Sequence, residues 1–329
     1  MSTSTTRTTA DPATAAPADS GAPAPERQTT RGRLVVRRFF RNWQAVFGLA
    51  TIGLLFALAY LGPLVSPWGY AESDYTAFLQ PPSADHWLGT TQIGNDVFAQ
   101  TMRGLQKSLV IGLLVGIIST GLASIVGAAA GYFGGRTDRI LMWFVDLLLV
   151  LPAFLVIAIL SPSFRGKTWL VFVALLAAFA WMITARIVRG MTLTLKEREF
   201  VTAAHFMGVP AWKIIARHIM PNMASLLIID ATITVGTAIL AETGLSYFGF
   251  GVQAPDVSLG TLIATGTGSA LTFPWLFLFA AGFLVVAVLS VNLVGDGLRD
   301  ALDASSQRGT RKDDDPAPSG PDSPMGAAP

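Results

Sequence analysis

The chain has 329 residues, of which 52% are hydrophobic and only 13% charged, whereas about a quarter are charged in an ordinary soluble protein. This composition excludes a typical soluble domain and indicates a polytopic membrane protein. The net charge of +2 implies no nucleic-acid surface, and the lack of cysteine excludes disulfides, cysteine-ligated metal sites and thiol catalysis.

The two ends of the chain are predicted to be disordered tails. Residues 1–36 begin with a stretch rich in Ala, Pro, Ser and Thr that has almost no large apolar side chains, and residues 301–329 end in the same way. Such segments bury too little surface to offset the entropy of ordering. The first segment also lacks the apolar core of a signal peptide.

Six apolar runs have roughly the 20 residues needed to cross about 30 Å of hydrocarbon. The sequence therefore predicts an all-α membrane protein with one helix and an external segment in residues 37–104 and a five-helix core in residues 105–300. Lys and Arg residues flank alternate ends of the runs, so the positive-inside rule places both termini in the cytoplasm. The runs cover residues 44–66, 106–131, 139–160, 168–188, 223–248 and 273–296.

The external segment and the second apolar run each contain residues that predict ordered packing. The external segment 67–103 is rich in Pro, Gly and aromatic residues, which predicts an ordered cap. A soluble protein resting on this cap and a simple cover for the helix ends are equally compatible with it. Gly112 and Gly116, and again Gly127 and Gly131, are spaced four residues apart, which predicts close helix packing in the membrane.

Several short motifs do not indicate a cofactor, metal or catalytic site. The stretch RGKT at 165–168 lacks the earlier glycine of a phosphate-binding loop, and GTGSA at 266–270 lacks the third glycine of a dinucleotide fingerprint. His86 is predicted to lie across the membrane from His205 and His218, so the three cannot share a metal. No set of side chains resembles the centre of a membrane hydrolase, so no enzymatic activity is expected of this chain.

Three acidic residues fall within the predicted spans, namely Asp146, Asp230 and Glu242. Ionisable side chains are costly in a membrane, so each is a candidate for lining or gating a translocation path. The competing interpretation, which we prefer, is structural: each carboxyl pairs with a neighbouring helix or is held protonated.

The stretch from Glu199 to Asn222 is polar and basic in an otherwise apolar chain. A helix is predicted over residues 196–207, Gly208 ends it, and Pro210 suits the first turn of a second helix. That second helix is amphipathic, and it continues until Pro221 opens the next span; its apolar residues are Trp212, Ile215 and Ile219.

The first of these short helices has the features of a docking surface. Ala203 and Ala204 are small and permit close approach of another backbone, while Phe200, Phe206 and Met207 provide apolar contacts. A partner that docks here and a plain pair of interfacial helices fit the periodicity equally well.

Four motifs in order resemble those of one family. TAA at 202–204, Gly208 and HIMPN at 218–222 resemble the EAA loop of bacterial ABC importer permeases. Three longer segments are similar to the C-type subunit of the dipeptide, oligopeptide and nickel branch, and the resemblance covers residues 37–300. They are HWLGTTQIGNDVFAQ at 86–100, GYFGGRTDRILMWFVDLLLVLPAFL at 131–155 and AETGLSYFGFGVQAPDVSLGTLI at 241–263.

The resemblance implies a type I importer-like permease in the bacterial inner membrane that moves di- or oligopeptides by alternating access. Its expected partners are a second permease, an external solute-binding protein and two ATP-binding subunits that hold ATP and Mg²⁺. Residues 189–222 would form the ATPase-coupling loop, with its contacts at Glu199, Thr202, Ala203, Ala204, Gly208 and Pro221.

The sequence departs from the family pattern at three positions and leaves alternatives open. Thr202 stands where the loop usually has Glu, Asn95 where Arg is common, and Leu259 where Trp is frequent. A self-contained secondary transporter or channel, and a membrane-embedded enzyme, are the competing classes. Within the importer class, the cargo is a peptide, nickel or another small solute, because the external binding protein largely sets selection.

Overall fold

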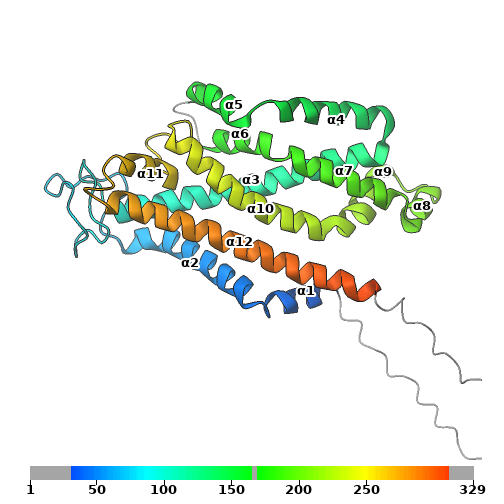
Figure 1. Cartoon of the computed structure of the whole chain (residues 1–329), viewed down its shortest axis with the longest axis horizontal. Helices are drawn as coiled ribbons and strands as arrows, with labels where there is room; N and C mark the ends of the chain where they lie inside the picture. The colour runs from blue at the N-terminus through cyan, green and yellow to red at the C-terminus, as the bar shows by residue number, and fades with distance from the viewer. Residues whose placement is uncertain (1–30, 165–168, 311–329) are drawn as a thin grey trace, which may run out of the picture.

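The computed structural model describes residues 31–164 and 169–310, and it is helical throughout, with no β-strand among those residues (Figure 1). Residues 1–30, residues 311–329 and the RGKT stretch at 165–168 lie outside the described part. The bounds of the long helices and their flanking helix are α1 Arg31–Phe39, α2 Trp43–Val65, α3 Val97–Phe133, α10 Met220–Tyr247 and α12 Trp275–Thr310.

Four helical stretches are each long and apolar enough to cross a membrane, and two bent helix pairs bring the candidate spans in the described residues to six. The unbroken stretches are Trp43–Val65, Val97–Phe133, Ala211–Tyr247 and Trp275–Leu302. The bent pairs are α4 Gly135–Val150 with α5 Ala153–Leu160, and α6 Leu170–Ala180 with α7 Met182–Lys196. The all-α fold is thereby confirmed.

The third and fourth predicted spans are bent, whereas continuous runs were expected. The first pair bends by 76° at Pro152. Proline disfavours helical geometry in the residue before it, and Leu151 accordingly has extended angles, φ −75° and ψ 124°. The second pair bends by 45° at Trp181, whose indole donates a hydrogen bond to the Ala178 carbonyl at 2.9 Å.

Helix α3 is the central element, since it packs against α2, α7 and α10. A Cβ atom at Gly112 would lie 2.5 Å from Cγ1 of Ile239 on α10. One at Gly127 would lie 2.8 Å from Cβ of Val188 on α7. The glycine four residues after each makes the same close approach to the same helix. The packing predicted from the glycine spacing is therefore confirmed.

Helices α1, α2 and α12 form a second group. A Cβ atom at Gly48 of α2 would lie 2.8 Å from Cβ of Leu293 on α12. Phe39, Ala45 and Ala301 form a buried cluster that joins all three helices. These contacts correct two boundaries, because α1 already begins at Arg31 and α12 continues past residue 300, in parts expected to be disordered.

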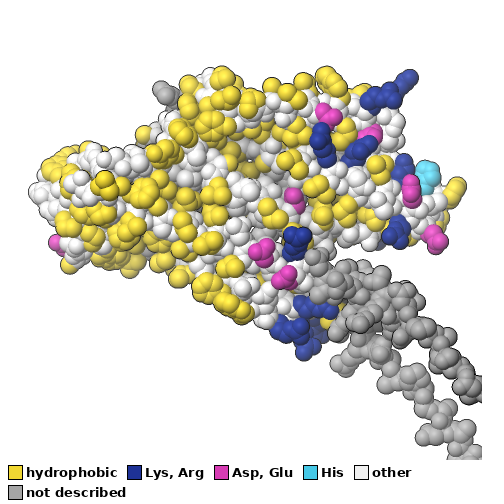
Figure 2. All heavy atoms as spheres, viewed as in Figure 1, with side chains coloured by type: hydrophobic (Ala, Val, Ile, Leu, Met, Phe, Trp, Pro, Cys, Tyr) yellow, Lys and Arg dark blue, Asp and Glu magenta, His cyan; other side chains and the backbone are white. Residues whose placement is uncertain are grey.

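The two ends of the molecule differ in character (Figure 2). Lys and Arg side chains gather at the end formed by α1, α8 and the start of α4, whereas apolar side chains cover the middle. We call this the basic end. The opposite end carries residues 66–96 and helix α11, Leu259–Thr267, and we call it the cap end.

The cap is ordered, as expected, and its centre is a buried histidine. His86 is 2% exposed, its Nδ1 lies 3.0 Å from Oδ1 of Asp96, and Trp68 stacks on its ring at 4.8 Å. Asp96 also accepts a hydrogen bond from the Ala99 N–H at 2.8 Å and so caps α3. Helix α3 therefore starts at Val97, which moves residues 97–104 out of the external segment and into this helix.

The amide of Asn95 and the carboxyl of Asp74 make further hydrogen bonds within the cap. Asn95 donates to the Glu72 carbonyl at 2.9 Å and to Ser73 Oγ at 3.2 Å, so this departure from the family pattern has a structural role. Hydrogen bonds from the side chain and backbone N–H of Thr76 hold the pKa of Asp74 below its ordinary value.

Replacing Gly127 with Ala should destabilise the protein, because the new Cβ would force α3 and α7 apart. We expect the free energy of unfolding to fall by about 1–3 kcal/mol, the usual cost of overpacking. Thermal unfolding of the purified protein in detergent measures this. Gly121→Ala, on the same helix with nothing within 4 Å of its Cβ, is the matched control. Equal stability of both variants would contradict the packing account.

Candidate functional site

The segment between α7 and α10, residues 197–219, forms the tip of the basic end, and we call it the α7–α10 segment. It consists of α8 Glu199–Phe206, a turn, α9 Ala211–Ile214 and a π-helical turn, η2 Ile215–Ile219. Gly208 ends the first helix with φ +76°, which glycine adopts without steric cost. Pro210 precedes α9 with φ −62°. The first short helix and the break at Gly208 are therefore as predicted, but the second helix is not short, because α9 and η2 continue directly into α10.

One side of the α7–α10 segment is fixed to the body of the protein. Val201, Ala204, Ile214 and Ile219 are all buried, and they form one core cluster with side chains of α3, α7 and α10. Lys196, at the end of α7, donates to the Tyr132 carbonyl of α3 at 2.6 Å. The inner side of the segment is therefore packed firmly on these helices.

The other side is open and apolar in an otherwise charged region. Phe206 is 84% exposed, Met207 74% and Trp212 69%. Glu199, Thr202 and Ala203 are exposed on the same two helices, and Glu199 lies in the first turn of α8. In Figure 2, yellow and cyan side chains lie beside charged ones at this tip. Exposed aromatic anchors of this kind are typical of a surface that binds another protein.

The structure corrects two details of the predicted surface. Ala204 is 1% exposed and packs inward, so only Ala203 of the alanine pair faces outward. Burial in the second helix falls on Ile214 and Ile219, whereas Trp212 points away from the core. A π-helical turn holds more residues than an α-helical one, so η2 shifts the apolar face relative to a regular helix.

Pro221 explains the π-helical turn and leaves the helix unbroken. Proline has no N–H to donate, and its ring clashes with the carbonyl four residues earlier. The N–H of Met220 bonds instead to the Ile215 carbonyl, five residues back. As a result, Ala211–Tyr247 form one helical stretch of 37 residues. The exposed Pro221 lies at the start of α10, where the α7–α10 segment joins the membrane helix.

Each of the three intramembrane acids has a polar partner. Asp146 is 56% exposed and pairs with Arg186 of α7. Asp230 of α10 accepts from Thr184 at 2.9 Å and from Thr120 at 3.3 Å. These contacts favour the structural interpretation, and the path-lining role of these residues stays a prediction.

Glu242 is the most enclosed of the three acids. Its exposure is 0%, and its two carboxyl oxygens accept hydrogen bonds from Ser108 of α3 at 2.9 Å and from Ser246 at 2.6 Å. A group enclosed in this way does not contact cargo in this conformation.

The cap end also contains a cluster of charged side chains that the sequence did not predict. Asp256 bonds to Arg103 and Lys107, both at 3.0 Å, and Lys107 lies 4.5 Å from the centre of the Trp169 ring. The spacing of the two cations, one helical turn apart on α3, was the available signal. Their shared partner is about 150 residues away and could not be identified from spacing.

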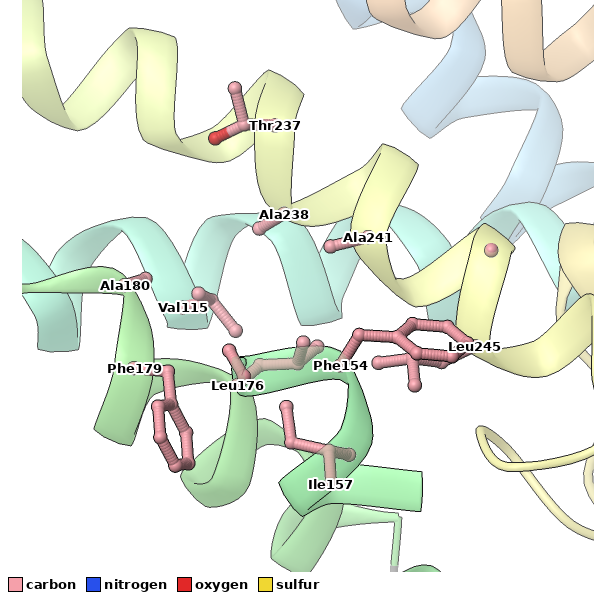
Figure 3. Close-up of a pocket in the computed structure, with 12 residues that line it drawn as sticks. Val115, Phe154, Ile157, Leu176, Phe179, Ala180, Thr237, Ala238, Ala241 and Leu245 are labelled. Atoms are coloured by element: carbon pink, nitrogen blue, oxygen red, sulfur yellow. The ribbon is translucent and has the colours of Figure 1, made fainter. Parts of the chain in front are cut away.

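The cavities in the described part of the chain include two of different character. One of about 310 Å³ is apolar: Phe154 and Ile157 of α5 and Leu176 of α6 face Ala238 and Ala241 of α10 across it (Figure 3). The other, of about 440 Å³, lies at the cap end and has amide, hydroxyl and carboxyl groups in its wall, including Gln92, Gln100, Asp256 and Thr261. The wall of the first has one hydroxyl side chain, Thr237, whereas the second has several groups that hydrogen-bond to a polar solute.

Comparison with known proteins identifies the family. A family model described as a binding-protein-dependent transport system inner membrane component matches residues 123–308, and one described as the N-terminal TM domain of oligopeptide transport permease C matches residues 30–82.

Individual relatives agree with the family models. Over 286 residues the chain is 57% identical to the oligopeptide transport system permease protein OppC of Mycobacterium tuberculosis, covering 86% of this chain and 98% of the relative. It is 39% identical over 269 residues to OppC of Haemophilus influenzae, covering 81% and 86%. It is also 38% identical over 273 residues to the dipeptide permease protein DppC of Bacillus subtilis, covering 83% and 85%. The chain therefore belongs to the binding-protein-dependent inner-membrane permeases, as a C-type subunit of a peptide ABC importer.

Proposed function

We propose that the α7–α10 segment is the surface on which ATP-binding subunits grip this permease and drive peptide import. The observation that carries the proposal is the pairing of an exposed apolar face, Phe206, Met207 and Trp212, with a base packed on α3 and α7. A partner that pulls on such a face moves the helices beneath it, because the base leaves no flexible link between them. Glu199, Thr202, Ala203, Gly208 and Pro221 contribute to this surface or its shape.

In this arrangement the basic end lies in the cytoplasm, together with both termini. The clustering of Lys and Arg at one end supports this orientation, since such residues are retained on the cytoplasmic side. The cap end then faces outward, where an external solute-binding protein delivers its cargo. ATP and Mg²⁺ are held by the ATP-binding subunits.

Transport follows from alternating access between two states of the assembled permease pair. A second permease completes a path of which this chain forms at most half. Closure of the ATP-binding subunits moves α8 and, through the shared core cluster, the helices α7 and α10. The cargo is a di- or oligopeptide, consistent with the names of the relatives.

Replacing Phe206 with Ala should weaken assembly with the ATP-binding subunits without unfolding the chain. Truncating an aromatic anchor at an interface costs at least about 2 kcal/mol, or roughly 30-fold in affinity. Co-purification of the subunits and peptide uptake measure the effect.

Trp43→Ala is the matched control for Phe206→Ala, because Trp43 is 71% exposed and lies at the same end, outside the α7–α10 segment. We expect this control to keep both assembly and uptake. Normal assembly and uptake in the Phe206→Ala variant would refute the docking role.

Substitutions at Gly208 should separate backbone shape from side-chain bulk. With φ +76°, valine at this position costs about 1–2 kcal/mol, whereas asparagine tolerates the left-handed conformation. Nothing lies within 4 Å of a Cβ atom placed there, so neither side chain clashes within the chain. We expect peptide uptake to fall at least tenfold in Gly208→Val and to be largely kept in Gly208→Asn. Equal uptake in both variants would contradict a role for this turn geometry.

A further inference from the structure

The helical stretch Ala211–Tyr247 connects the two ends of the molecule without a break. Its 37 residues correspond to a length of about 55 Å. It starts in the α7–α10 segment at the basic end and finishes at the cap end, beside α11 (Figure 1). Whatever is attached firmly to its last turns therefore moves with the α7–α10 segment.

Glu242 organises such an attachment. The hydroxyls of Ser108 and Ser246 each donate their hydrogen to one of its two carboxyl oxygens. Their lone pairs are then free to accept, and they do so from backbone N–H groups of the cap end. The Leu259 N–H donates to Ser108 Oγ at 3.3 Å, and the Val252 N–H donates to Ser246 Oγ at 3.1 Å.

Both serine hydroxyls can donate to residue 242 because its side chain ends in two acceptor oxygens. A glutamine there would offer one oxygen and one NH₂ group. The serine opposite the NH₂ would have to accept from it through one lone pair, and its own hydrogen would lose the buried oxygen to which it now bonds. The substitution therefore removes one of the two hydrogen bonds from the serines to residue 242 while keeping the size of the side chain.

Close backbone contacts surround this network. A Cβ atom at Gly251 would lie 2.7 Å from Cα of Ser246, and one at Gly260 would lie 2.7 Å from Cα of Thr243. The segment after α10 and the start of α11 are thus held in direct contact with the end of α10. We name the group formed by Glu242, Ser108 and Ser246, with the N–H groups of Val252 and Leu259, the cap clasp.

We infer that Glu242 is a positioning residue for transport, which fastens the cap end to α10 and so couples events at the cap to the α7–α10 segment. Docking of a peptide-loaded binding protein at the cap is transmitted along α10 to the ATP-binding subunits, and movement of those subunits is transmitted back. The inference rests on the proposed function for its two end points, and on the cap clasp for the connection between them.

The test uses the complete importer in lipid nanodiscs, with and without its peptide-loaded binding protein. In Glu242→Gln we expect assembly and basal ATP hydrolysis to be kept, and the stimulation by the loaded binding protein to fall at least tenfold. Ser108→Ala removes the hydrogen bond to Glu242 and also the acceptor of the Leu259 N–H, so it should lower the stimulation at least as strongly. Ser124→Ala is its matched control, since Ser124 is also buried on α3 and, within the described part of the chain, its hydroxyl bonds to the Thr120 carbonyl of its own helix.

Hydrogen–deuterium exchange on the isolated chain provides a second readout that does not depend on the partners. We expect faster exchange at residues 250–260 in Glu242→Gln and Ser108→Ala, and no change at residues 197–219. Failure of the ATP-binding subunits to co-purify with the unaltered chain would count against the proposed function and leave the exchange test intact. Undiminished stimulation in Glu242→Gln and Ser108→Ala, or unchanged exchange at residues 250–260 in both, would overturn the inference.

Discussion

Close backbone packing around α3 is the constraint on which the rest of the structure depends. In a membrane there is little hydrophobic gain from joining helices, so contact area and fit must hold them together. The glycines of α3 provide that fit on two sides, with α10 against Gly112 and α7 against Gly127. Because the α7–α10 segment is the connection between these two helices, its position follows from the same contacts.

The α7–α10 segment illustrates how an exposed surface becomes mechanically useful. Its inner residues, such as Ala204 and Ile214, belong to a core cluster, whereas Phe206 and Trp212 have no cover. A flexible loop with the same exposed side chains could bind a partner, but its movement would not be passed on to the membrane helices. The combination of a fixed base and an open face suits a subunit whose energy comes from ATP hydrolysis elsewhere.

Sequence reasoning succeeded where a local rule determines the structure. Composition and run length predicted an all-α membrane protein, the spacing of Gly112 and Gly116 predicted close packing, and Gly208 with Pro210 predicted the break between two helices. These features depend on neighbouring residues along the chain.

Features that depend on the third dimension were missed. The alanine pair was predicted to face a partner as a unit, but Ala204 packs inward because α8 rests on α3 and α7. The π-helical turn before Pro221 shifts the buried face away from the residues predicted for it. The bend at Pro152 was not predicted, because the apolar run that contains it is continuous. The partners of Glu242 and Asp256 come from elements far apart in the sequence, which no spacing rule identifies.

Site-directed cross-linking tests the central claim most directly, because the chain contains no cysteine of its own. A single cysteine is introduced as Ala203→Cys, which leaves the Phe206 anchor in place, in the assembled importer in native membranes, and a short thiol-to-amine cross-linker is added. The account predicts a cross-link to an ATP-binding subunit, and none from Trp43→Cys, which is also exposed at the same end of the molecule. Absence of that product from Ala203→Cys in an importer that still transports peptide would contradict the account.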